Sequence, residues 1–413
     1  MSWSQTCAQC PSGYYSGWWH LCRNHTRLVY RLATESKLVP KTLLKWSIHN
    51  FGAYLLGEQP NCGEQAWFDG QGVTARGRSV SRGWEPWRSR KGKSMRVFVA
   101  GGSGVIGRQL VPMLVAEGHE VVASARLSAR LGEIRAMGAE AVVMDGLDAT
   151  SVRDALSAAR PEVVVHQMTA LAGLSNLRRF DRAFAATNRL RTEGTRNLLQ
   201  AAAAAGVRRL VAESFTGWTN DKGGSPVKDE TCPLDGEPPR SMRQSLAAIA
   251  QLEEMVRVAA GVEGVVLRYG HLYGPGAPAF LDAVRRRKLP VVGDGAGRWS
   301  FTHVVDAARA AVVAICHAGT GLYNIVDDDS PPAAVWIPFL AELAGAKPPM
   351  HVPVWVGKLA AGEAVVSMMT SACGSSNAKA RAQLGWAPGH ATWRDGFLAW
   401  VSEERASKDN EAP

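Results

Sequence analysis

Three evenly spaced glycines between a strand-like and a helix-like segment most constrain how this chain can fold. The run "MRVFVA" at 95–100 is short, apolar and β-branched, which is typical of a buried parallel strand. It leads into "GGSGVIGRQLVPMLVAEG", where Gly101, Gly104 and Gly107 stand at the strand-to-helix turn. Glycine lets the backbone approach a pyrophosphate, and the helix N-terminus offers free N–H groups to it. The pattern predicts a dinucleotide-binding turn.

Strand and helix patterns keep alternating after this turn. The strand-like runs are "HEVVASA", "AEAVVMD", "PEVVVHQ", "VRRLVAES" and "GVVLRYG". Helical patterns separate them, as in "TEGTRNLLQAAAAAG". Such alternation predicts an α/β fold with a Rossmann-type doubly wound parallel sheet. The alternation fades after residue 270, so we expect the cofactor part mainly at 95–270 and a smaller C-terminal α/β substrate-binding region at 271–403.

The charge of the chain is concentrated before residue 95. Residues 1–94 hold 13 Lys and Arg, 5 Asp and Glu, and seven of the 14 tryptophans, with little periodicity. We expect this extension to be largely disordered, and either a tail or a segment upstream of the true start at Met95. The rest of the chain is nearly neutral, which gives no reason to expect a nucleic-acid partner. No run of 18 uncharged apolar residues predicts a membrane span, and residues 404–413 form a polar tail.

Cysteine and histidine suggest one metal site, which we do not adopt. Cys7, Cys10, Cys22 and His25 have a spacing that can close a tetrahedral zinc site, but no strand pattern surrounds them. The run Asp327–Asp329 cannot all face one ion, so a solvated helix-capping turn is expected there. The three cysteines of the body are widely spaced and odd in number, which indicates reduced thiols in a cytoplasmic protein.

The end of the second predicted strand distinguishes the two nicotinamide cofactors. An acidic residue there would bind the ribose 2′-OH of NAD. This chain has Ala125 followed by Arg126, with Arg130 beyond. A guanidinium suits a 2′-phosphate, so NADP is the predicted cofactor and NAD is left open. The alternative is that Arg126 is a solvated loop residue.

Residues 95–403 resemble the extended short-chain dehydrogenase/reductase superfamily, in its NAD(P)-dependent epimerase/dehydratase group. The resemblance rests on the glycine turn and on "MDGLDA", "VVVHQMTALAG", "LRYGHLYGPG", "FTHVVDAARA" and "NAKARAQLGWAP". It implies a nicotinamide cofactor and a small-molecule substrate, and leaves a homodimer open. The implied cofactor-binding residues are Gly101, Gly104, Val105, Ile106, Gly107, Arg126, Asp145, Gly146, Thr169 and Ala170.

The resemblance also implies a catalytic serine, tyrosine and lysine, of which two are missing. Ser214 matches the serine. The tyrosine position falls on Ser245 and the lysine position on Ile249, and no tyrosine or lysine occurs between Lys228 and Arg268. A serine hydroxyl is far less acidic than a phenol, and isoleucine carries no charge, so the usual proton relay cannot operate. The chain therefore resembles an atypical branch that keeps the cofactor fold without this pair.

A second departure concerns the substrate. The resemblance implies that nucleotide-sugar members of the group carry an Arg-Asp pair whose arginine binds the diphosphate, and here Trp299 and Ser300 stand at those positions. Trp299 offers an apolar aromatic face, so an aromatic, polyketide-like or terpenoid molecule is expected instead. The alternative is that Trp299 only packs in the interior. The candidate substrate contacts are Ser214, Trp299 and Tyr273.

Three function classes follow from these features. The first is an NAD(P)-dependent oxidoreductase or epimerase-like enzyme with a non-standard proton donor. Ser214 and His166 are the main candidates for this donor, and Thr169, Tyr273 and a bound water are the alternatives. His166 ends the fourth predicted strand, where ligands of open α/β sheets gather, but a packed histidine fits as well. The second is a non-catalytic NADP-binding sensor or assembly protein, and the third is a lyase or cyclase that reuses the fold.

Overall fold

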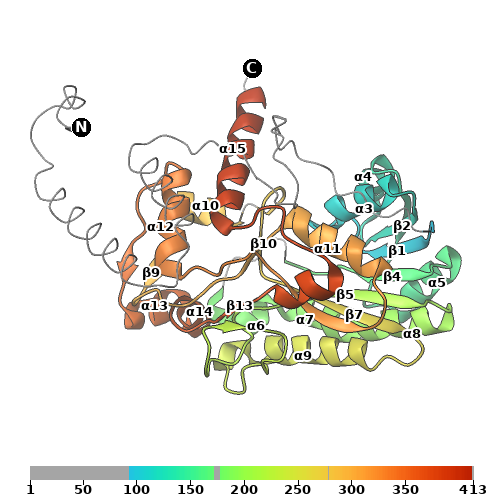
Figure 1. Cartoon of the computed structure of the whole chain (residues 1–413), viewed down its shortest axis with the longest axis horizontal. Helices are drawn as coiled ribbons and strands as arrows, with labels where there is room; N and C mark the ends of the chain where they lie inside the picture. Colours follow the sequence, from blue (N-terminus) through green and yellow to red (C-terminus); the bar gives the residue numbers. More distant parts are fainter. Residues whose placement is uncertain (1–92, 172–176, 278, 412–413) are drawn as a thin grey trace, which may run out of the picture. The chain divides into compact units, whose positions relative to one another are not determined.

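A parallel sheet of seven strands forms the centre of the protein (Figure 1). The structure, a computed structural model, describes residues 93–171, 177–277 and 279–411, so the N-terminal zinc candidates lie outside it. The strand order is β11-β7-β5-β4-β1-β2-β3 and every pairing is parallel. The strands are β1 (Arg96–Ala100), β2 (Glu120–Ala125), β3 (Glu140–Val143), β4 (Val163–His166), β5 (Arg209–Phe215), β7 (Glu263–Tyr269) and β11 (Gly321–Ile325). This confirms the predicted fold class.

Helices cover both faces of the sheet, because its buried strands are apolar on both sides. One core cluster joins α3, α4 and α11 to side chains such as Val97, Val99 and Val211. The opposite cluster joins α5, α8 and α9 to side chains such as Phe98 and Ala212. Figure 1 shows these two layers above and below the sheet. The helices are α3 (Gly107–Ala116), α4 (Leu131–Ala136), α5 (Ala149–Ala159), α8 (Thr195–Ala204), α9 (Arg243–Arg257) and α11 (Val304–Cys316).

The strand order reverses between β1 and β4. From β1 the chain proceeds outward through β2 and β3, then crosses back to β4 and continues to β5, β7 and β11. The loops that follow β1 and β4 therefore leave in opposite directions, which opens a crevice at their carboxyl ends. The glycine turn follows β1 directly, so the candidate site lies at this point of the sheet.

The smaller region has its own core, which is rich in aromatic side chains such as Trp299, Phe301 and Trp336. Its helices are α10 (Ala279–Arg285), α12 (Ala333–Leu343), α13 (Val354–Ala361), α14 (Glu363–Thr370) and α15 (Trp393–Glu411). Its paired short strands are β6 (Val227–Lys228) with β13 (Gly374–Ser375), β8 (His271–Tyr273) with β10 (Phe301–His303), and β9 (Val291–Val292) with β12 (His351–Val352).

Short helical segments connect these elements. They are η1 (Ser128–Arg130), η2 (Leu177–Arg179), α6 (Phe180–Ala183), α7 (Ala185–Arg189), the π-helical η3 (Leu190–Gly194) and η5 (Ala380–Leu384), and η4 (Arg240–Met242).

Two expected boundaries differ from the structure. The sheet is completed by β11 and covered by α11, so the cofactor part includes segments from beyond residue 270. Helix α15 runs to Glu411, past the expected end of the fold at Glu403. The reason is tertiary: Glu404 pairs with Arg285 of α10, which anchors a polar segment whose composition alone predicts fraying.

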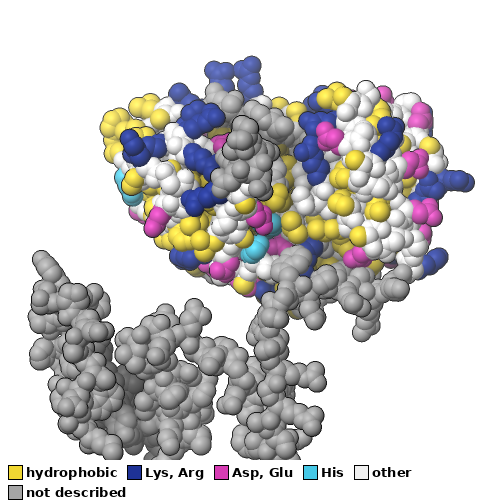
Figure 2. Space-filling view, turned by 90° about the horizontal axis from the view of Figure 1, so that it is seen from above, with side chains coloured by type: hydrophobic (Ala, Val, Ile, Leu, Met, Phe, Trp, Pro, Cys, Tyr) yellow, Lys and Arg dark blue, Asp and Glu magenta, His cyan; other side chains and the backbone are white. Residues whose placement is uncertain are grey.

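Charged side chains are mixed on the face seen in Figure 2, where Lys and Arg lie among acidic and apolar side chains. Among the described helices, none has the length and apolar character needed to cross a bilayer. Within the same residues no three His, Cys, Asp or Glu side chains gather as a metal site.

Candidate functional site

The glycine turn forms a tight cradle between β1 and α3. Gly101 has φ 95°, and a Cβ there would lie 2.7 Å from the Gln167 carbonyl oxygen. A Cβ on Gly107 would lie 2.5 Å from the carbonyl oxygens of Gly101 and Gly102. Only glycine fits these contacts, because the helix start and the β4 loop approach within the space of a methyl group.

The cradle presents unpaired donors, as an anion site requires. Val105 is 36% exposed, whereas Ile106 is 4% exposed and packs into the core. Among the described residues, neither backbone N–H of this pair has a hydrogen-bond partner. Free N–H groups at the start of α3 fit a pyrophosphate. The residues present therefore fit a dinucleotide.

Arginines gather at the end of β2. Arg126 is exposed, and its side chain has no hydrogen bond or ion pair with any described residue. Arg108 of α3 and Arg130 of η1 each bind Glu133 at 2.7 Å. The hydrogen bond from Arg130 lowers the pKa of Glu133. The single carboxylate of Glu133 thus pairs with Arg108 and Arg130 but not with Arg126. The three arginines therefore leave a net positive charge beside the edge of the cradle.

The loops after β3 and β4 complete the rim. The Asp145 carboxylate is exposed and accepts the Leu147 N–H at 3.0 Å. Gly146 is buried, and a Cβ on it would lie 2.6 Å from the Met168 sulfur. Thr169 and Ala170 are half-buried directly after β4. Because β1, β2, β3 and β4 are parallel, all the residues that the resemblance assigns to the cofactor lie at one edge of the sheet.

His166 is completely buried at the end of β4. Its Nδ1 accepts the Met168 N–H at 3.1 Å, so Nε2 carries the proton and donates it to Thr195 Oγ1, also at 3.1 Å. Burial, and then the positive charge of Arg191, lower the pKa of His166 to about 4. Both ring nitrogens are occupied, so the geometry favours the packed-histidine alternative over a proton donor.

Ser214 is 4% exposed, and its hydroxyl donates to Glu253 at 2.7 Å. Arg268 binds the same carboxylate twice, at 2.7 and 2.6 Å. This network ties β5 to α9 and β7. Glu253 lies eight residues beyond Ser245 on α9, about 12 Å along the helix. The structure therefore does not bring Ser214 and Ser245 together.

Ser245 and Ile249 both face the interior, with 0% exposure. The Ser245 hydroxyl donates to Asp181 at 2.7 Å and accepts from Asn188 at 3.0 Å. The backbone N–H groups of Gln244 and Ser245 donate to the same aspartate, at 3.0 and 2.8 Å. Asp181 therefore caps the first turn of α9, and Ser245 belongs to that cap.

The two aromatic candidates lie inside the smaller region. Trp299 is 4% exposed, stacks on His271 with ring centroids 4.1 Å apart, and donates its indole N–H to the Met368 carbonyl at 3.0 Å. Tyr273 is completely buried, with its hydroxyl 3.1 Å from an Asp327 oxygen. These contacts favour a packing role for Trp299 and Tyr273.

The acidic run that follows β11 is solvated only in part, because the side chains of Asp328 and Asp329 are 37% and 44% exposed whereas Asp327 is buried. Asp327 is 1% exposed beside Tyr273, and Asp328 pairs with Arg381. Asp329 accepts the indole N–H of Trp393 at 2.9 Å. The expectation of a fully solvated turn was wrong for Asp327, because the partners of these carboxylates lie far from them in the sequence, at least 49 residues away.

Three polar residues beside the cradle were not among the sequence candidates. Gln167 follows β4, and its side-chain amide donates to the Tyr269 hydroxyl at 3.3 Å. Tyr269 in turn donates to the Ala307 carbonyl at 3.3 Å. Glu213 lies on the neighbouring strand β5 and is 8% exposed. The sequence signal for Glu213 is an acidic residue within the strand pattern "RLVAESF", which is otherwise typical of a buried strand. A carboxylate is costly to bury, so one at such a position indicates a partner or a functional role.

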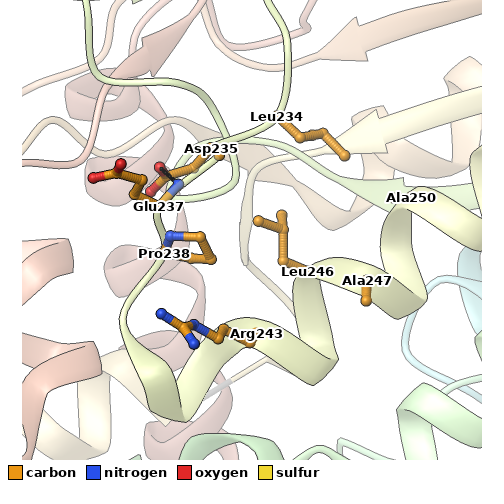
Figure 3. Close-up of a pocket in the computed structure, with 9 residues that line it drawn as sticks. Leu234, Asp235, Glu237, Pro238, Arg243, Leu246, Ala247 and Ala250 are labelled. Carbon is orange, nitrogen blue, oxygen red and sulfur yellow. Dashed lines mark hydrogen bonds between the residues drawn. The ribbon is translucent and has the colours of Figure 1, made fainter.

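The surface groove in Figure 3 contains no residue of the Gly101–Gly107 cradle. It measures about 670 Å³ and runs between the Leu234–Pro238 loop and the outer side of α9. Its helical lining includes Arg243, Ala247 and Ala250. None of the candidate residues lines it, so we place the chemistry at the sheet edge.

The chain belongs to the NAD dependent epimerase/dehydratase family, whose model matches residues 97–325. It is 46% identical over 311 residues to the 3-diazoavenalumate denitrifying reductase of a Streptomyces species, covering 73% of this chain and 99% of that protein. It is 30% identical over 245 residues to 4-hydroxy-2-methyl-3-oxo-4-farnesyl-3,4-dihydroquinoline-1-oxide ketoreductase of Stigmatella aurantiaca, covering 57% and 69%.

Solved structures show the same fold. The UDP-glucose 4-epimerase of Thermotoga maritima with UDP-glucose superimposes with a TM-score of 0.60 at 24% identity, covering 76% of this chain and 99% of that one. The UDP-glucose 4-epimerase of Thermus thermophilus in complex with NAD gives a TM-score of 0.59 at 25% identity, covering 76% and 100%. This chain is therefore a nicotinamide-cofactor protein of the oxidoreductase and epimerase type.

Proposed function

We propose that the chain is an NADPH-dependent reductase that removes the diazo group of a small, apolar, non-nucleotide-sugar metabolite. The observation that carries this proposal is the 46% identity to 3-diazoavenalumate denitrifying reductase, over 99% of that protein. The cradle at Gly101–Gly107 supports it, because its geometry fits the pyrophosphate of the cofactor. When bound, the reduced nicotinamide supplies the hydride.

The missing tyrosine and lysine support this reaction over carbonyl reduction. A carbonyl that accepts a hydride becomes an alkoxide, which needs a proton donor held at the oxygen. A diazo compound takes up its proton on carbon and then loses N₂ as the hydride arrives, so no alkoxide forms that would need a donor at the Ser245 position. Ser245 and Ile249 serve instead to start and pack α9.

The smaller region supports a substrate other than a nucleotide sugar. The positions that the resemblance assigns to diphosphate binding carry Trp299 and Ser300, and both side chains are buried and bonded internally. No guanidinium replaces the missing one at these two positions. The aromatic rings of Phe215, His271 and Phe280 lie in contact nearby, which favours an apolar or aromatic molecule.

The proposed cofactor contacts divide along the sheet. The Gly101–Gly107 turn would hold the pyrophosphate, and Asp145 and Gly146 would flank the adenine. Arg126, with free donors at the end of β2, would bind the 2′-phosphate of NADP. Thr169 and Ala170 would line the path of the dinucleotide beyond β4.

The test is a substrate panel read by two signals. Diazo compounds and matched ketones are incubated with NADPH, and NADPH absorbance and ¹⁵N₂ release are followed together. We expect one N₂ for each NADPH oxidised. Turnover of ketones alone would favour the second candidate, carbonyl reduction, which the ketoreductase relative supports.

A further inference from the structure

Glu213 lies on the cofactor side of β5, which distinguishes it from its neighbour Ser214. Side chains alternate along a strand, so Val211, Glu213 and Phe215 share one face and Ser214 points to the other. Val211 belongs to the core cluster under α3 and α11. Ser214 points to α9, as its bond to Glu253 shows.

Glu213 is also level with the glycine turn. Ala100, His166 and Ala212 are aligned across β1, β4 and β5. One residue further, Gly101, Gln167 and Glu213 follow in the same register. Parallel neighbours are about 4.8 Å apart, so Glu213 lies about 10 Å from Gly101 across the crevice. The adenosine half of a bound dinucleotide would extend toward β2 and β3, and the nicotinamide half toward β4 and β5.

Glu213 is largely buried, its carboxylate oxygens keep some solvent contact, and they have no bonded partner among the described residues. The residue is 8% exposed, and no described residue gives its side chain a hydrogen bond or ion pair. Glu253 has the same exposure but is bonded to Ser214 and Arg268. A largely buried carboxylate that lacks hydrogen-bond partners but can still be reached from the crevice is available to a ligand.

Two polar groups interact electrostatically with Glu213, which are Tyr269 of β7 and Arg191 of η3. The other titratable or polar groups on elements next to β5 are Arg268 of β7, His166 and Gln167 of β4, Glu253 of α9, and Asp306 and Arg309 of α11. Arg268 and Asp306 already have ion-pair partners. Burial raises the pKa of Glu213 to about 7, against the opposing effect of Arg191.

We propose that Glu213 is the proton donor of the reductase, at the nicotinamide end of the crevice. This inference rests on the proposed function. A diazo carbon takes up one proton from Glu213 and becomes a diazonium carbon. The hydride from the reduced nicotinamide then forms the second C–H bond, while the C–N bonding pair leaves with N₂. The proton and the hydride together convert R₂C=N₂ to R₂CH₂ and N₂, and Glu213 is reprotonated from water.

The first experiment tests whether Glu213 lies beside the nicotinamide of the bound cofactor, and it needs no turnover. NADP⁺ carries a positive charge on its nicotinamide and NADPH does not, whereas the phosphates are common to both. Calorimetry in buffers of different ionisation enthalpy, near pH 7, gives the protons released on binding each form. We expect NADP⁺ to release more protons than NADPH, because its charge favours ionised Glu213. The difference should vanish in Glu213→Gln and persist in the surface control Glu254→Gln. An unchanged difference in Glu213→Gln would overturn the proposal.

The second experiment measures the proton in catalysis. Wild-type kcat/KM should fall as the pH rises through about 7, as the acid ionises. In Glu213→Gln, kcat/KM should no longer fall as the pH rises through about 7. At pH 6 it should be at least tenfold lower than in the wild type, while the affinity for NADPH is retained. Glu213→Asp should keep this pH dependence at a lower rate, which guards against a variant that does not fold. A full rate and an unchanged pH dependence in Glu213→Gln would refute the role. If wild type turns over neither diazo compounds nor ketones, the proposed function fails, and the proton release still tests the position of Glu213.

Discussion

The carboxylate of Asp181 accepts both the hydroxyl and the backbone N–H of Ser245, at 2.7 and 2.8 Å. Ser245 stands where the family resemblance places a catalytic tyrosine. The side chain at this position is therefore engaged by a helix cap contributed from α6. A phenol could not fit the same bonds, because its oxygen lies several ångströms farther from the backbone.

Ser245→Ala should affect stability and leave turnover within about twofold. The variant loses two hydrogen bonds, one to Asp181 and one from Asn188, so the free energy of unfolding should fall by about 1–2 kcal/mol. Asp181→Ala should cost more, about 2–3 kcal/mol, because it removes the backbone cap of α9 as well as the bond to the Ser245 hydroxyl. Urea unfolding and steady-state NADPH oxidation measure the two effects. A large loss of turnover in Ser245→Ala, with NADPH binding intact, would show that Ser245 is the proton donor after all.

Arg126→Ala should remove the preference for NADPH. The side chain has no described partner and stands at the end of β2, so its loss should weaken NADPH binding by about 1.5–3 kcal/mol while NADH binding stays the same. Arg135→Ala, an exposed arginine on α4, is the control. Calorimetric titration of NADPH and NADH into both variants measures the preference. If Arg126→Ala still prefers NADPH, Arg126 does not bind the 2′-phosphate.

Ser214→Ala should act mainly on the Glu253–Arg268 pair. Removing a hydroxyl donor from this buried carboxylate should lower the free energy of unfolding by about 1–3 kcal/mol. Turnover at saturating substrate should change less than in Glu213→Gln. Thermal melts and steady-state rates of the two variants, compared at pH 6, measure this. A tenfold loss of turnover in Ser214→Ala, without loss of stability, would instead support the role that the resemblance assigns to it.

The stability of the protein should depend on the titration of Glu213. Burial raises its pKa from 4.5 to about 7, so the folded state holds this proton more tightly than the unfolded chain. Stability from this group is fully present below pH 4.5 and is lost as the pH rises to about 7. The loss approaches roughly 3 kcal/mol, at 1.36 kcal/mol per unit. Glu213→Gln should lack this loss in urea titrations from pH 5 to 8, and parallel curves for variant and wild type would contradict it.

Residues 95–413 should fold without the N-terminal extension. The sheet, its helices and all three core clusters lie within these residues. A fragment that begins at Met95 should unfold cooperatively, with a melting temperature within a few degrees of the full chain. Calorimetry on both proteins tests this, and an insoluble or non-cooperative fragment would show that the extension is needed.

Local patterns were sufficient to predict most of the sheet and the cradle. Buried parallel strands are near-continuous apolar runs, and the spacing of Gly101, Gly104 and Gly107 follows from backbone contacts within a few residues. The strands β1 to β5 and β7 appear where these runs occur, and the family is confirmed. The preference for NADP stays a prediction.

The polar interior could not be predicted in the same way. The cap on Ser245 comes from a residue 64 positions earlier, and Asp329 meets an indole 64 positions later. The face of β5 that carries Val211 is covered by α11, whose sequence begins 91 residues after Glu213. Such pairings depend on how elements that are distant in the sequence pack together. The local sequence pattern around a residue does not predict them.

The late return of the chain to the sheet constrains how the protein can be made. Strand β7 binds β11 along five aligned residue pairs, and β11 ends at Ile325. While the ribosome is still synthesising the smaller region, the outer edge of β7 has open hydrogen-bonding groups. Such an edge invites pairing with other chains, and premature termination before Ile325 would leave it uncovered for good. The cofactor-binding half therefore cannot be expressed alone by ending the chain at residue 270. A chimera that exchanges substrate-binding regions between relatives has to keep β11 and α11 together with the cofactor-binding half.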